Sequence, residues 1–230
     1  SFGLTGACDL SSLQPNQHVM LTRTTKRALW ALACLLLSHA CLAQNTLTVE
    51  SFQAANESMT TFRFYVNLSN PSDRVSAVYG NAEDPMELDC PSGVYNNVFN
   101  TSWNASGINP AFLGTVPELV DDTYATIGLE GPATAAPMAG AADPSLVEDS
   151  NNPVTPFFLT NGATSMDATS EIGASWFVLN TASNGLPNDD GRVLVMQVTT
   201  TGTIAGKVNV QVFPQGIGSE ELRLTFPFSG

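Results

Sequence analysis

Apolar and polar side chains alternate with a period of two over much of the chain after residue 43. The segment FRFYVNL (62–68) places Phe, Phe, Val and Leu at alternate positions, which is the pattern of a β-strand with one buried face. The same alternation predicts strands around 47–49, 75–79, 127–129, 176–179 and 222–228. Residues 193–198 are apolar at nearly every position, which predicts a central strand with both faces buried.

The segment 192–213 combines two predicted strands with a turn between them. Valines at 208, 210 and 212 alternate with other side chains, and TTTGTIAG separates this run from the apolar run before it. We therefore predict an antiparallel hairpin over 192–213. The last strand, 222–228, contains Pro227, and proline confines a strand to the edge of a sheet or to a partner strand that does not need its N–H.

The fold class follows from these strands and from the residues that separate them. After Gln44 no segment keeps a helical period, and Gly, Pro, Asn and Asp interrupt the chain at short intervals. We predict an all-β fold, an antiparallel β-sandwich or jelly roll with long loops, as a single domain over 44–230. Residues 131–170 have little pattern and are predicted as a long functional or mobile loop, with a missed strand pair as the alternative.

The first 43 residues have the composition of a targeting segment. Residues 20–43 combine basic side chains at 23–27, an apolar run at 28–37 and the small-residue site CLA at 41–43, which predicts a helical secretory signal peptide. An uncleaved signal anchor, or a lipid attached at Cys41, is the alternative. Residues 1–19 are predicted to be an upstream or non-native extension. We expect an extracellular protein, secreted or at the cell surface, that leaves the membrane after signal cleavage.

Removal of this leader changes the chemistry that the chain can perform. His18 and His39 are both lost, Cys90 is the one cysteine that remains, and 20 acidic side chains face 5 basic ones. Nucleic acid and anionic membranes repel such a charge. A serine or cysteine nucleophile would lack its usual imidazole base, so we do not expect an enzyme, although a glycoside hydrolase with two carboxylates stays open. Cys90 is expected to be buried, with an intermolecular bridge as the alternative.

Oxygen-rich loops offer candidate ligands for calcium, which binds carboxylate, amide and backbone oxygens. The first candidate is NGLPNDDG (184–191), and the second is the pair of acids at 121–122. The residues concerned are Asn184, Asn188, Asp189, Asp190, Asp121 and Asp122. Ordinary turns, in which Asn and Asp bond to their own backbone, are the alternative interpretation.

Asparagine sequons and aromatic residues suggest contact with sugars. N-glycosylation is predicted at Asn56, Asn67, Asn100 and Asn104. Tyr95 and Trp103 lie in GVYNNVFNTSWNAS, where their rings could stack on a sugar. Burial of these rings in the core is the alternative.

Three stretches, which cover about half of residues 44–230, resemble known proteins: NPAFLGTVPELVDDTYATIGLEGP (109–132), ASWFVLNTASNGLPNDDGRVLVMQVTT (174–200) and GKVNVQVFPQG (206–216). Here the chain resembles secreted β-sandwich modules of aquatic microbes. The resemblance implies an extracellular β module with a structural or surface role, and it implies no catalytic residue.

The leading functional hypothesis is a secreted structural or adhesive subunit, glycosylated and assembled into a filament by exchange of terminal strands. Its partner would be itself, or other extracellular proteins or glycans. The strands nearest the two ends are short and apolar on one face, so either could pair with a neighbouring sheet. The predicted contacts are Leu47, Val49, Phe52, Leu222, Leu224 and Phe226. The alternative is a calcium-dependent carbohydrate-binding module.

Overall fold

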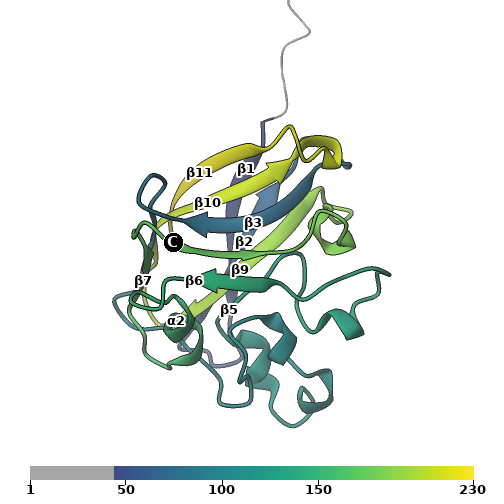
Figure 1. The fold of residues 1–230 in the computed structure, drawn as a ribbon. Coiled ribbons are helices and arrows are strands. Elements are labelled where there is room, and N and C mark those ends of the chain that lie inside the picture. The colour runs from purple at the N-terminus through teal and green to yellow at the C-terminus, as the bar shows by residue number, and fades with distance from the viewer. Residues whose placement is uncertain (1–43) are drawn as a thin grey trace, which may run out of the picture. The chain divides into compact units, whose positions relative to one another are not determined.

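The structure, a computed structural model, describes residues 44–230. In these residues two antiparallel β-sheets face each other and enclose one main core (Figure 1). The predicted all-β sandwich is therefore confirmed. The predicted extension and signal peptide lie outside the described residues.

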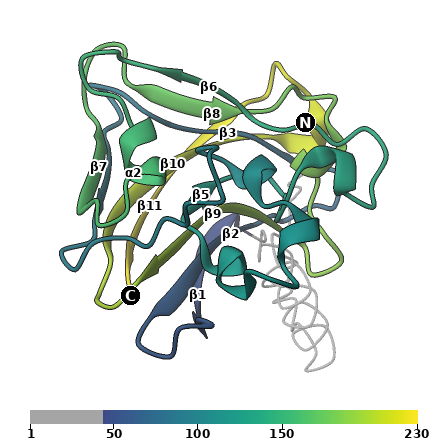
Figure 2. The same cartoon turned by 90° about the horizontal axis from the view of Figure 1, so that it is seen from below.

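The smaller sheet has four strands in the order β1, β2, β9, β5. Their bounds are β1 Thr46–Gln53, β2 Thr60–Asn67, β9 Arg192–Thr200 and β5 Tyr124–Ala125. Seen from below in Figure 2, β1, β2 and β9 lie opposite the sheet that contains β3, β8 and β6.

The larger sheet has seven strands and is organised around β10 (Ala205–Phe213). One side of β10 pairs along its length with β11, while the other side pairs with β3 and then with β4. The sheet continues outward through β8 to β6, and through β4 to β7. The bounds are β3 Arg74–Gly80, β4 Met86–Asp89, β6 Ser145–Glu148, β7 Ser165–Ala168, β8 Ala174–Phe177 and β11 Leu222–Ser229.

Large side chains from both sheets fill the space between them. Trp176 of β8 is fully buried and contacts Phe158 at right angles, with ring centres 5.9 Å apart. Its indole Nε1 donates to the carbonyl oxygen of Val195 on β9, at 3.2 Å. This bond joins the two sheets directly, because β8 and β9 belong to different layers.

The smaller sheet is buried on its outer face as well. There Tyr65 and Leu194 pack with Leu119, Tyr124 and other side chains of the segment 105–124 in a second apolar cluster. The apolar run of β9 thus has a buried neighbour on each side, which confirms the central strand predicted at 193–198.

The predicted hairpin over 192–213 is wrong. β9 and β10 are both strands as expected, but they do not pair with each other. Each belongs to a different antiparallel sheet, so the connection between them crosses from one layer to the other. Ile204, in this connection, is buried and exchanges two backbone hydrogen bonds with Gly230, of 3.1 and 2.9 Å. A short turn rich in Gly and Thr can connect strands of two different sheets as well as the two strands of a hairpin. β9 is buried on both faces, between the main core and the second apolar cluster.

Two further predictions are corrected by the structure. Ile127 and Leu129 are buried but lie in a loop rather than a strand. The segment 131–170 is not one long loop, because it contains β6, β7 and the short helix α2 (Thr155–Leu159). These two strands do not pair with each other but with β8 and β4 at opposite ends of the larger sheet.

Helical structure within 44–230 is limited to α2 and short 3-10 turns, and none of it is long and apolar enough to cross a membrane. The 3-10 turns are η1 Ala105–Gly107, η2 Pro110–Phe112, η3 Pro117–Asp121, η4 Ala133–Ala135, η5 Ser183–Gly185 and η6 Pro214–Gly216.

Replacing Phe64 with alanine should lower the free energy of unfolding by about 3–5 kcal/mol. The ring is fully buried and meets Phe228 of the other sheet at right angles, with ring centres 4.8 Å apart. The matched control is Phe52→Ala, because Phe52 is 44% exposed and only its contact with Arg63 is lost, which is worth about 1 kcal/mol or less. Chemical denaturation measures both, and equal losses would contradict this picture of the core.

Candidate functional site

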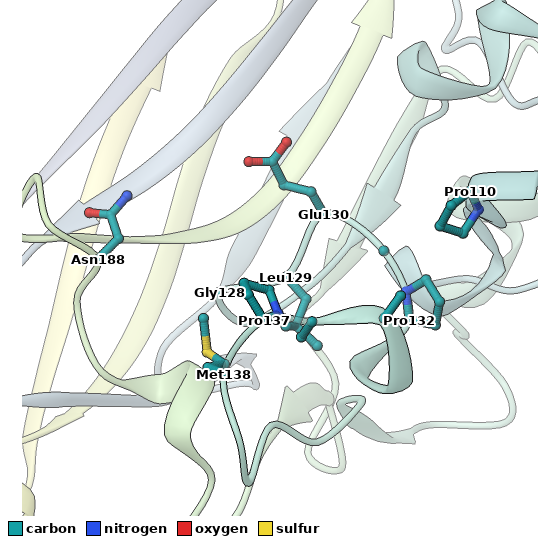
Figure 3. A pocket seen from close by; sticks show the side chains of 11 residues that line it. Pro110, Gly128, Leu129, Glu130, Pro132, Pro137, Met138 and Asn188 are labelled. Atoms are coloured by element: carbon teal, nitrogen blue, oxygen red, sulfur yellow. The ribbon is translucent and has the colours of Figure 1, made fainter. Parts of the chain in front are cut away.

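A hollow of about 370 Å³ opens beside the loop 128–138, on the side of the smaller sheet that faces away from the core (Figure 3). Its walls are largely apolar, and they come from Leu129, Pro132, Pro137 and Met138. The carboxylate of Glu130 and the amide of Asn188 are the polar side chains that line it.

A second hollow of about 560 Å³ adjoins the first and shares Glu130, Met138 and Asn188 with it. It is lined by Tyr65 and Arg192, whose guanidinium carbon lies 4.0 Å from the centre of the tyrosine ring. Arg192 also forms an ion pair with Glu50 of β1. An ion pair of 3.0 Å between Arg63 and Glu130 fixes the same wall.

These two hollows could hold a ligand but offer little for catalysis. Their charged groups are largely paired, and the guanidinium of Arg192 covers the face of Tyr65 that would otherwise be open to a sugar ring. Ser183 Oγ and Arg192 Nε are buried without a hydrogen-bond partner among the described residues, and both residues line the second hollow. Unsatisfied polar atoms of this kind favour occupation by a polar ligand or by water.

The first candidate calcium loop is not gathered around one point. Asn184 is fully buried, accepts from Ala142 N and donates to the carbonyl oxygens of Ile127 and Ala142, so it ties three segments together. Asn188 accepts from the backbone of Asp190 and Arg192 as in an ordinary turn. Asp189 and Asp190 are exposed. No group of three or more acidic, Cys or His side chains within 44–230 is placed to hold a metal ion.

The second candidate pair is buried in the structure beneath β2 and the loop 95–100. Asp121 accepts from Ala55 N at 2.7 Å and from the Thr61 hydroxyl at 3.2 Å. Asp122 accepts from Asn97 N at 2.5 Å and from Asn100 Nδ2 at 2.6 Å. Because protein donors already occupy these oxygens, both carboxylates act as braces for the chain, and the calcium proposal has no support from their geometry.

Asp122 is the acid most strongly affected by its surroundings. Burial raises the pKa of its carboxyl to about 7, although the donated hydrogen bonds from Asn97 and Asn100 act in the opposite direction. A group with such a pKa is a candidate catalyst when it faces a cleft. Asp122 is only 1% exposed, so its role is structural.

The four sequons differ in accessibility. Asn56 is exposed and Asn67 is partly exposed. Asn100 and Asn104 are buried, and their side-chain amides donate to Asp122 and to the carbonyl oxygen of Pro144. The structure therefore leaves Asn100 and Asn104 inaccessible, although glycosylation itself stays a prediction.

The two predicted stacking residues are both engaged within the protein. Trp103 packs against the main core, which matches the alternative interpretation. Tyr95 is partly buried, and its hydroxyl accepts from Asn97 Nδ2 at 2.8 Å. The fully buried Cys90, whose thiol pKa is raised by burial, likewise matches the interpretation as a small core residue.

The terminal strands form a second candidate site, at the side of the sandwich where the sheets end. β1 is the edge of the smaller sheet, and β11 is an edge of the larger sheet. They lie next to each other (Figure 1). A groove of about 520 Å³ between them is lined by Leu47, Val49, Pro227, Phe228 and Ser229.

The residues predicted to make polymer contacts divide into two groups. Leu47, Val49, Leu224 and Phe226 are partly buried and pack against the main core. Phe52 and Leu222 are 44% and 42% exposed. The sequence missed Phe228 as a lining residue, although it continues the alternation of Leu224 and Phe226. It also missed the pairing of Arg192 with Tyr65, for which no local pattern exists.

No family model, curated protein or solved structure matches the chain. The resemblance to secreted modules of aquatic microbes stays a prediction.

Replacing Asp122 with asparagine should change how stability depends on pH. The folded carboxyl, with a pKa of about 7 against an ordinary value of 3.8, keeps a proton that the unfolded chain releases. Folding therefore takes up a proton between about pH 4 and pH 7, and stability falls as the pH rises through this window. Wild type should lose up to about 4 kcal/mol relative to Asp122→Asn across it. Urea unfolding at several pH values measures the difference, which would stay constant if Asp122 were ionised throughout.

Glycosylation in a host that modifies sequons should discriminate among the four sites. Asn56 is exposed and can receive a glycan in the folded domain, and Asn67 can do so once its amide releases the hydroxyls of Thr46 and Thr48. Asn100 and Asn104 would have to be modified before their amides are buried. Glycopeptide mass spectrometry of the secreted protein should find modification at Asn56 or Asn67 and little at the other two. High occupancy at Asn100 in folded protein would contradict the described packing around Asp122.

Proposed function

We propose that this protein is an extracellular structural or adhesive subunit that joins copies of itself through its terminal strands. The observation that carries the proposal is the position of β1 and β11. They are edges of different sheets, lie next to each other and flank a groove that both strands line. Sheet edges present free backbone donors and acceptors, which are templates for another strand.

Strand addition fits the geometry better than strand exchange. β1 pairs with β2 over its whole length, and β11 pairs in the same way with β10. Exchange would require one of these strands to leave its own sheet, and Leu47, Val49 and Phe226 to leave the core. Addition to a free outer edge displaces no strand, so it forms the same assembly without the free-energy cost of breaking native contacts.

A second surface is available for contacts beyond the first. Phe99 and Phe112 are 50% and 42% exposed, and their ring centres lie 5.9 Å apart on the loops outside the sheets. Aromatic residues are enriched at protein–protein interfaces relative to the rest of the surface. Two different contact surfaces on one subunit generate an open chain when the symmetry does not close.

The assembly of the secreted protein is the direct test of this function. Negative-stain electron microscopy and sedimentation velocity, over a range of protein concentrations, should show dimers and longer assemblies rather than monomers alone. Salt should favour association, because it screens the repulsion between acidic subunits. A protein that stays monomeric at all concentrations and salt levels would rule out the proposed function.

Carbohydrate binding is the second candidate, and the two adjoining hollows are the observation that favours it. Glu130 and Asn188 line both hollows and Arg192 lines the second, and their polar groups could bond to sugar hydroxyls. The support is weaker than for assembly, because Trp103 and Tyr95 are engaged elsewhere. A glycan array with no bound sugar, with and without calcium, would remove this candidate.

A further inference from the structure

Five strands form the edges of the two sheets in residues 44–230, and most of them are protected from pairing with another chain. β5 has 2 residues, while β6 and β7 have 4 each. The backbone of β5 is also covered, since Ala125 N donates to the carbonyl oxygen of Trp103. Very short edges and covered edges are two of the devices by which natural sheets avoid aggregation.

β11 is long, with 8 residues, but carries a proline at its free side. Ile204 and Gly230 exchange two hydrogen bonds at the start of the β10–β11 ladder. Hydrogen-bonded pairs alternate along an antiparallel ladder, so the pair Lys207 and Pro227 falls on a position without bonds between the two strands. The backbone nitrogen of Pro227 therefore points to the free edge, where it has no hydrogen to donate.

β1 is the one long edge in the described residues that lacks such protection. It pairs with β2 over 8 residues without a register shift, and it contains neither proline nor lysine. Ala54 N bonds to Met59 O on the same ladder, and Leu68 N bonds to Gly191 O on the other side of β2. By alternation, the backbone groups that face the free edge belong to Leu47, Val49, Ser51 and Gln53.

The charge around this edge suits contact between two copies of an acidic chain. Glu50 is the charged residue of β1, and Arg192 neutralises it. Arg63 stands on β2 next to β1 and pairs with Glu130. Two of the 5 basic residues after position 43 thus lie beside this edge, where they reduce the repulsion between copies.

We propose that the free edge of β1 is the assembly surface, and that its occupant is the same edge of a second copy, paired antiparallel about a two-fold axis. This inference rests on the proposed function and narrows it to one surface. Each copy presents an identical row of free donors and acceptors, and isologous contacts of this kind are the commonest in soluble oligomers. The two smaller sheets become one sheet, and the apolar side chains of Leu47 and Val49 from both copies cover the groove.

Hydrogen exchange of individual amides tests this surface directly, because it measures whether the outward-facing amides of β1 are protected. In the assembled protein the amides of Leu47, Val49, Ser51 and Gln53 should be protected together with those of Thr48, Glu50 and Phe52, which bond to β2 in every state. In dilute, dissociated protein only the second set should stay protected. Protection that alternates in the assembled protein as well would overturn the proposed surface.

A proline at Ser51 tests the same surface by mutation. Ser51 is exposed, and by alternation along the ladder its amide faces the free edge. Ser51→Pro should therefore remove free donors from the edge while the bonds to β2 remain. The dimer dissociation constant should rise at least about tenfold, because each copy loses one interface bond. Ser51→Ala keeps the backbone amide and should leave the dimer dissociation constant unchanged. Ser229→Pro is the matched control, since by alternation it adds a proline to the free edge of β11, and it should also have little effect.

The outcomes separate this inference from the function on which it rests. A wild-type protein that is monomeric under all conditions contradicts both. A wild-type oligomer that Ser51→Pro leaves intact, while circular dichroism shows the variant folded, overturns the β1 surface and leaves the function standing. Dissociation by Ser229→Pro and not by Ser51→Pro would assign the contact to β11. If Ser51→Pro does not fold, the exchange pattern of wild type decides the question.

Discussion

The carbonyl oxygen of Val195 fixes the relation between the two sheets. The register of β2 and β9 shifts between Phe64 and Tyr65, which leaves Val195 as the extra residue of a β-bulge. Its oxygen accepts from Trp176 Nε1 of the opposite sheet and from Thr126 N of the loop after β5. A fully buried indole needs such an acceptor, so the bulge lets the largest side chain of the core be buried without an unsatisfied donor. The loop after β5, outside the smaller sheet, is also bonded to β9, because Thr126 N and Gly128 N donate to the carbonyl oxygens of Val195 and Leu194.

Most of the long strands could be predicted from the sequence, because each has one face in the core and a clear period of two. This holds for β1, β2, β3 and β11, and the proline of β11 correctly identified an edge. The connection after β9 could not be predicted, since the local turn signals of a hairpin and of a crossing are the same. Strands of 4 residues, such as β6 and β7, are too short to show a period.

The candidate sites were harder to predict, because asparagine and aspartate serve structure and binding with the same atoms. Asn184 and Asp122 lie in loops whose composition suits calcium, yet their oxygens are occupied by backbone and amide donors from distant parts of the chain. Such partners are 22 to 42 residues away, which no local motif records. The acidic composition is therefore divided between buried braces and an exposed surface. In the proposed assembly, the exposed part would set the repulsion between copies of the protein.

Pro227 has a mechanical consequence for any joint made at this side of the sandwich. On this side the larger sheet ends at β11, where the missing donor interrupts the outer row of backbone groups. A joint through β1 would carry tension through a continuous ladder in one layer, while the other layer stays discontinuous. Such a connection would resist stretching in the plane of the smaller sheet. It would bend more easily perpendicular to that plane, because only one of the two sheets is continuous across the joint.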